Sequence, residues 1–145
     1  MSLVPVVDIE GYLAGRWALT RLVEDCTRAE QGHFIGEARC DVSSAGVVEY
    51  VESGELTFAG YCGPAQRRYR YLVTAPGKAE VCFADGRHFF HLDWRSGCAG
   101  ARHRCGADTY VGLHLARSAM RFETRWRVLT PDGVLVLSSV ADRIT

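Results

Sequence analysis

Apolar and polar residues alternate along much of the chain, and the pattern is clearest between Met120 and Val128. Apart from Thr124, the even-numbered positions of this segment are apolar, whereas the odd-numbered positions are all Arg or Glu. This period of two is typical of a β-strand with one buried and one solvated face. The apolar segment Val134–Val140 follows after the turn-forming residues Thr130-Pro131-Asp132-Gly133. The two segments are therefore predicted to form an antiparallel hairpin.

Eight further segments have the composition of strands, and short connections separate them. They are Trp17–Val23, Phe34–Cys40, Val47–Val51, Leu56–Gly60, Tyr69–Val73, Ala79–Ala84, His88–Trp94 and Tyr110–Arg117. Connections this short exclude the helical crossovers of a parallel sheet. We expect an all-β fold, a single closed antiparallel β-barrel of about 8–10 strands formed by residues 1–145 as one domain.

Three connecting segments carry more specific expectations. Glu52-Ser53-Gly54-Glu55 is predicted to be a turn between two strands, and Ser96–Asp108 to be the longest irregular loop. A short helical turn is expected at Asp8–Leu13, before the first strand.

Composition restricts the function classes. The chain has 17 basic and 17 acidic residues and a formal net charge of zero, so no nucleic-acid partner is expected. No segment approaches the ~18 apolar residues of a membrane-spanning helix, and the first residues do not resemble a signal peptide. We therefore expect a cytoplasmic protein whose six cysteines are reduced.

Aromatic residues dominate the positions that alternation assigns to the barrel interior. They either fill the interior or line a cavity for a small, partly apolar ligand. Aromatic, histidine and arginine side chains are the candidate ligand-binding groups: Tyr69, Tyr71, His88, Phe90, His114, Phe122, Trp126 and Arg67.

Metal or cofactor binding is a further hypothesis. His88 and His91 are three positions apart, and an odd offset places two residues of a regular strand on opposite faces. We therefore expect that they do not share a metal. Cys98, His103 and Cys105 lack the paired spacing of a zinc knuckle. We expect no bound metal and no cofactor; the alternatives are zinc at these Cys and His residues and haem ligated by His114 or His88.

An enzyme is a second class of function. His103, Cys105 and Asp108 are candidate acid–base or nucleophilic groups in the predicted loop, and His91 with Asp93 is a second pair on one strand face. The chain contains no nucleophile elbow and no phosphate-binding glycine loop. Catalysis therefore stays open, as does a third class, a structural or interaction barrel, which includes a homodimer.

Two short motifs resemble a known family. Gly15-x-Trp17 at the start of the first strand, together with Arg143 after the last, is similar to the opening motif and late arginine of lipocalin-like (calycin) barrels. That resemblance implies that Arg143 crosses the indole face of Trp17 in a structural cation–π contact. The stretch His103–Gly112, with Trp126-Arg127-Val128 and Asp142-Arg143, resembles a bacterial lipocalin-like domain family of unknown function. The resemblance implies a fold and no activity.

Overall fold

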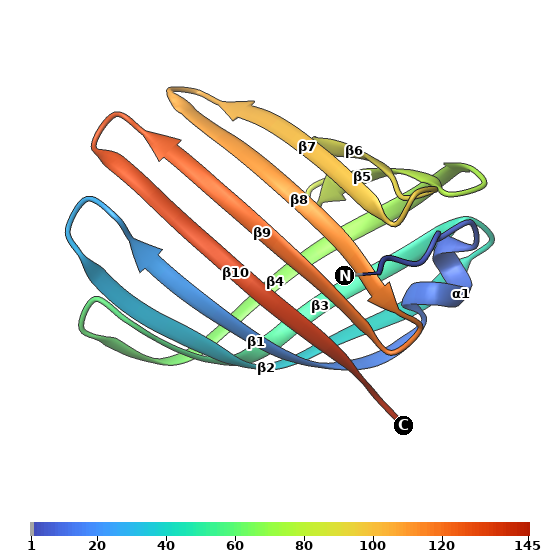
Figure 1. The fold of residues 1–145 in the computed structure, drawn as a ribbon, viewed down its shortest axis with the longest axis horizontal. Coiled ribbons are helices and arrows are strands. Elements are labelled where there is room, and N and C mark those ends of the chain that lie inside the picture. Colours follow the sequence, from blue (N-terminus) through green and yellow to red (C-terminus); the bar gives the residue numbers. More distant parts are fainter. Residues whose placement is uncertain (1) are drawn as a thin grey trace.

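The computed structural model describes residues 2–145, which form one short helix and ten antiparallel strands (Figure 1). The elements are α1 (Ile9–Leu13), β1 (Gly15–Asp25), β2 (Glu30–Ser44), β3 (Val47–Phe58), β4 (Tyr61–Ala75), β5 (Lys78–Phe83), β6 (His88–Asp93), β7 (Cys98–Cys105), β8 (Asp108–Ser118), β9 (Arg121–Thr130) and β10 (Gly133–Ile144). The predicted all-β, antiparallel class is confirmed. No helix in the described part of the chain is long and apolar enough to cross a bilayer.

The strands form one sheet in the order β6-β5-β4-β3-β2-β1-β10-β9-β8-β7. The first and last strands of the chain pair along nearly their whole length, from Arg16 opposite Ile144 to Asp25 opposite Leu135. This pairing curls the sheet into a barrel. The barrel is nearly but not fully closed, because β6 and β7 are the two edge strands of the sheet. The wide sheet therefore exposes only two short edge strands.

The helix and the chain before it close one end of the barrel (Figure 1). The side chain of Asp8 accepts a hydrogen bond from the amide of Gly11 at 2.9 Å and so caps α1. The amide of Val6 donates to the carbonyl of Trp94, and that of Val4 to the carbonyl of Ala116. The most deeply buried side chains come from α1 itself and from the strands: Ile9, Leu13, Trp17, Leu19, Cys40, Val48, Val81, Leu92 and Trp94.

The turn expected at 52–55 is wrong, because β3 runs through it without interruption to Phe58. Gly54 lies opposite Gly36 on β2, and a Cβ on Gly36 would lie 2.6 Å from the Cα of Gly54. These glycines therefore allow two strand backbones to approach closely, and they do not form a turn. The actual reversal is at Ala59 and Gly60, both of which have positive φ.

The irregular loop expected at 96–108 is also wrong, since most of it is strand β7. β7 pairs with β8 from Cys98 opposite Leu115 to Cys105 opposite Asp108, and Gly106 with positive φ begins the tight turn between them. Inward and outward side chains do alternate along β7, with Ala99 buried and Ala101 half-buried. The hydrophobic pattern in the sequence is weak because these inward side chains are small.

Candidate functional site

A cavity of about 730 Å³ occupies the barrel toward the end opposite α1. Its volume lies within the range of small-molecule sites. Its lining is mostly apolar and aromatic and comes from all parts of the sheet except β7: Arg21, Val23, Phe34, Glu52, Leu56, Phe58, Ala65, Gln66, Arg67, Arg68, Tyr69, Phe83, Ala84, Asp85, Phe89, Tyr110, Trp126, Val128, Leu135 and Leu137.

One wall of the cavity is a continuous aromatic stack. The ring of Phe89 lies between those of Phe83 and Trp126, with centroid separations of 4.5 and 5.0 Å and near-parallel planes. Tyr69 stacks against Phe89 at 5.6 Å, and Tyr110 meets the same ring edge-on. This wall offers flat apolar surface to a planar molecule.

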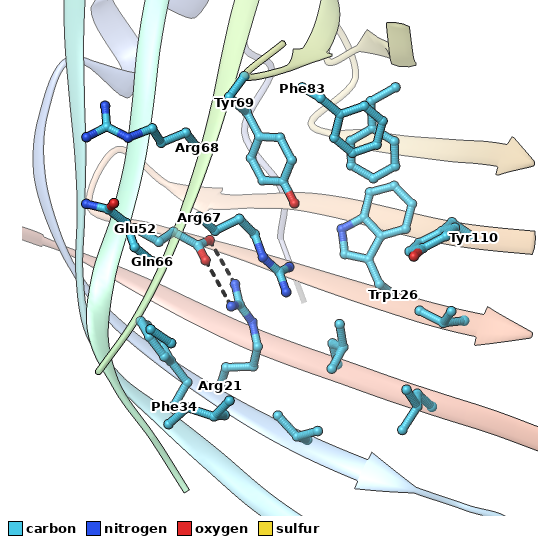
Figure 2. A pocket seen from close by; sticks show the side chains of 18 of the residues that line it. Arg21, Phe34, Glu52, Gln66, Arg67, Arg68, Tyr69, Phe83, Tyr110 and Trp126 are labelled. Carbon is cyan, nitrogen blue, oxygen red and sulfur yellow. Dashed lines mark hydrogen bonds and ion pairs between the residues drawn. The ribbon is translucent and has the colours of Figure 1, made fainter. Parts of the chain in front are cut away.

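A buried ion pair forms the floor of the cavity (Figure 2). The guanidinium of Arg21 donates two hydrogen bonds to the carboxylate of Glu52, at 2.9 and 2.8 Å, and a third to the hydroxyl of Ser139. The hydroxyl of Tyr50 donates to the same carboxylate at 2.6 Å. Burial alone raises the pKa of Glu52, but the hydrogen bonds and charge of Arg21, with the charge of Arg67, outweigh it and leave the pKa below its usual value.

Arg67 is an exposed, cavity-lining cation that forms no ion pair with a carboxylate within residues 2–145. Its side chain extends into the cavity beside Arg21, and the Tyr69 hydroxyl points toward it (Figure 2). Burial raises the pKa of Tyr69, and the nearby charge of Arg67 opposes that rise. Because Glu52 is paired with Arg21 and Asp85 with Arg87, neither lining carboxylate is paired with Arg67.

The eight predicted ligand-binding residues divide into three groups. Arg67, Tyr69 and Trp126 line the cavity. Tyr71, Phe90, His114 and Phe122 are buried in the packed interior outside the lining. His88 lies on the outer surface. Alternation identified the inward face of each strand and not the depth at which a residue lies in the barrel.

His114 illustrates the effect of depth. Its ring packs against Phe90 and Trp126 at centroid distances of 5.1 and 5.7 Å, and only 5% of the residue is exposed. Burial lowers the pKa of His114 to about 4, so the ring is neutral near pH 7. Its Nδ1 has no hydrogen-bond partner in the described structure. A haem in the cavity would be separated from His114 by Trp126, so the arrangement does not fit axial ligation by this residue.

The expected orientations of His88 and His91 are wrong because β6 contains a bulge. Val81 of β5 pairs with Phe90 and Cys82 with His88, which leaves Phe89 as an extra residue. Both Phe89 and Phe90 are consequently buried, while His88 and His91 are exposed on the same outer face with ring centroids 4.7 Å apart.

Of the catalytic candidates from the predicted loop, Cys105 and Asp108 lie opposite each other beside the β7–β8 turn. His103 faces inward against Phe83 and Phe89, at centroid distances of 5.6 and 5.3 Å, whereas Cys105 is exposed at the end of β7. Among the described residues, the metal-ligand geometry groups neither Cys98 nor Asp108 with His103. His91 and Asp93 lie on the same exposed face of β6, where Asp93 forms an ion pair with Arg95 at 2.8 Å.

The family motif is present at the closed end. The guanidinium carbon of Arg143 lies 4.2 Å from the ring centroid of Trp17. Gly15 has a φ of 116°, a conformation that favours glycine, and a Cβ there would lie 3.4 Å from the Arg143 guanidinium. These residues do not belong to the cavity lining, and their contacts are structural.

Several lining residues escaped the sequence analysis. Phe89 was missed because a bulge has no local signature in the alternation. Arg21 and Glu52 had a signal that was not used: each shares the inward parity of its strand with buried neighbours such as Leu19 and Tyr50. Opposite charges at inward positions of two strands indicate a buried pair.

Known structures of different kinds share this fold. The S-type phycobiliprotein lyase CPES from Guillardia theta superposes with a TM-score of 0.71 at 8% identity, over 98% of this chain and 94% of that one. A de novo designed fluorescence-activating β-barrel superposes with a TM-score of 0.53 at 17% identity, over 96% of this chain and 100% of that one. These identities establish a shared fold alone.

A protein of unknown function from the DUF3598 family of Nostoc punctiforme PCC 73102 gives a TM-score of 0.66 at 9% identity. It is matched over 98% of this chain and 51% of its own, so the present chain spans about half of it. No curated protein matches in sequence. The lipocalin-like barrel implied by the sequence motifs is confirmed. Residues 13–143 match the model of a family of unknown function, DUF6314, and the chain belongs to that family.

Proposed function

We propose that the barrel binds a small organic molecule with a planar apolar body and an acidic group. The observation that carries the proposal is Arg67, a cation without a carboxylate partner in residues 2–145 that extends into an aromatic cavity of about 730 Å³. Arg67 is exposed to solvent in the open cavity, and a ligand that covers it would enclose its charge at a cost unless the ligand supplies a counter-charge. An anionic group on the ligand supplies the partner that the described chain does not.

The remaining lining fits such a ligand. The stacked rings of Phe83, Phe89 and Trp126 accept a flat apolar body, and its burial supplies most of the affinity. The guanidinium of Arg67 and the hydroxyl of Tyr69 then orient the acidic group through charge-assisted hydrogen bonds. The occupied Arg21–Glu52 pair holds the floor rigid and takes no part in the recognition. That small-molecule role is in keeping with the phycobiliprotein lyase and the designed barrel that share the fold.

Two matched fluorescent probes test the proposal. 8-Anilinonaphthalene-1-sulfonate is an aromatic anion with a flat naphthalene ring, and N-phenyl-1-naphthylamine has the same rings without the sulfonate. Arg67→Gln should weaken the anion's binding by about tenfold or more, because a charge-assisted hydrogen bond is lost, and should change binding of the neutral probe little. Arg68→Gln is the control, since Arg68 is part of the lining but its guanidinium points away from the cavity (Figure 2).

Ala65→Phe distinguishes the cavity from the outer surface. Ala65 lines the cavity, so a larger ring there should weaken both probes. Equal affinity of the anionic probe for the Arg67→Gln and Arg68→Gln proteins would contradict the role of Arg67. Failure of the wild-type protein to bind either probe would contradict the proposed binding site itself. Thermal unfolding of each variant checks that the barrel is intact.

A further inference from the structure

The bulge in β6 creates a second cluster of functional groups, on the outside of the barrel. Glu80 of β5 pairs with His91, and Cys82 pairs with His88, so the three side chains of Glu80, His88 and His91 rise from adjacent strands on one face. Without the extra residue Phe89, the two histidines would point in opposite directions. The cluster lies on the far side of the sheet from the cavity and belongs to a different surface.

The three side chains are close enough to share one cation. One nitrogen or oxygen of each lies within 4.8 Å of those of the other two. Nδ1 of His88 is 3.8 Å from Oε1 of Glu80, and the two imidazole centroids are 4.7 Å apart. Ligand atoms around a tetrahedral zinc ion are spaced by about 3.4 Å, given metal–ligand bonds near 2.1 Å. Small side-chain rotations close this difference, and the histidines are exposed and free to make them.

The surroundings leave the Glu80 carboxylate available. Arg70, which faces Cys82 from β4, is engaged by Glu49 at 2.8 Å, and Asp93 and Arg95 pair with each other. Glu80 thus has no arginine or lysine ion pair within residues 2–145. The thiol of Cys82 donates a hydrogen bond to Oε1 of Glu80 at 3.3 Å. Such a second contact orients a carboxylate ligand.

We propose that Glu80, His88 and His91 bind a single zinc ion, with a fourth position open to water. Two imidazoles and one carboxylate are a ligand set that zinc accepts. The site would tie β6, which is an edge strand of the sheet, to β5. Its first expected effect is therefore to stabilise the edge where the barrel is not closed by hydrogen bonds.

Calorimetric titration of ZnCl₂ into the metal-stripped chain, with a non-thiol reductant, tests the site. One equivalent should bind, and the thermal unfolding midpoint should rise with zinc concentration. His88→Ala, His91→Ala and Glu80→Gln should each weaken binding by about tenfold or more, since loss of a ligand costs at least as much as loss of a group that only orients a ligand. His33→Ala, an exposed histidine on β2, is the matched control.

The exposed thiols are the competing explanation. Titration with CoCl₂ distinguishes binding at the thiols from binding at Glu80, His88 and His91, because thiolate ligands add a charge-transfer absorption that a site of nitrogen and oxygen ligands lacks. Stoichiometric binding without that absorption, lost in His88→Ala and kept in Cys98→Ser, is the expected result. The proposal is overturned if the wild-type chain takes up no zinc, or if His88→Ala binds zinc as tightly as wild type.

Discussion

The guanidinium of Arg143 lies over the indole ring of Trp17, with its central carbon 4.2 Å from the ring centroid. The same guanidinium donates to the carbonyl oxygens of Ala14 and Ala119, at 2.8 and 3.2 Å, and to that of Tyr12. The indole nitrogen of Trp17 donates in turn to the carbonyl of Leu13. The last strand is thereby fastened to the end of α1 and to the β8–β9 turn at the closed end of the barrel.

Arg143→Met should lower the free energy of unfolding by about 1–3 kcal/mol, because a cation–π contact and several hydrogen bonds are lost while the aliphatic stem is kept. Urea denaturation followed by tryptophan fluorescence measures the change. Arg104→Ala, at an exposed position on β7, is the control and should leave the midpoint near that of wild type. Equal midpoints for the two variants would show that the contact contributes nothing.

Glu52→Gln should destabilise the barrel by about 3–5 kcal/mol, because it leaves the enclosed Arg21 charge without its counter-ion. The side chains of this pair are only 9% and 5% exposed. Glu37→Gln breaks the exposed pair with Arg16 and should have a much smaller effect. Similar losses in the two variants would contradict the view that burial determines the contribution of the Arg21–Glu52 pair.

The Glu52 carboxylate also makes the unfolding free energy of the barrel depend on pH in the acid range. Because the pKa of Glu52 is lowered in the folded chain, its stabilisation is present above its ordinary value of 4.5 and is lost as the pH falls through the folded pKa. The difference in unfolding free energy between wild type and Glu52→Gln should therefore shrink below pH 4.5. Denaturation series at several pH values measure it, and a difference that stays constant with pH would count against the ionised pair.

His114 should destabilise the fold over a different pH range. Its pKa falls from 6.5 in the unfolded chain to about 4 in the barrel, so below pH 6.5 the unfolded state binds a proton that the folded state does not. Wild type should lose about 2 kcal/mol more than His114→Leu between pH 7 and pH 5. Parallel pH profiles for the two proteins would show that the His114 ring is not held neutral.

Gly112 faces the indole of Trp126 across the β8–β9 pair, and a Cβ there would lie 2.5 Å from that ring. Gly112→Ala should displace the ring from its stack with Phe89 and cost about 1–3 kcal/mol through overpacking. Gly100→Ala on β7 is the control, because its Cβ would meet open space. Near-ultraviolet circular dichroism and thermal unfolding report the change. An unaltered aromatic signal in Gly112→Ala would contradict the close contact.

The strands themselves follow from local sequence. The alternation between Met120 and Val128 predicted β9 correctly, with Phe122 buried and Arg121, Arg125 and Arg127 exposed. The turn residues at 130–133 predicted its hairpin with β10. The Gly15-x-Trp17 motif and Arg143 indicated how the barrel ends meet. These features depend on neighbouring residues or on a short motif, and so the sequence carries them directly.

The tertiary structure alone decided three things. The crossing of Gly36 and Gly54 keeps β3 continuous, because two distant backbones approach closely there. The bulge at Phe89 reverses the orientation of His88, because pairing with β5 overrides the period of two. Depth along the barrel separates Arg67 in the cavity from His114 in the core, because alternation specifies which face is inward and contains no information about which inward residues the closed end covers.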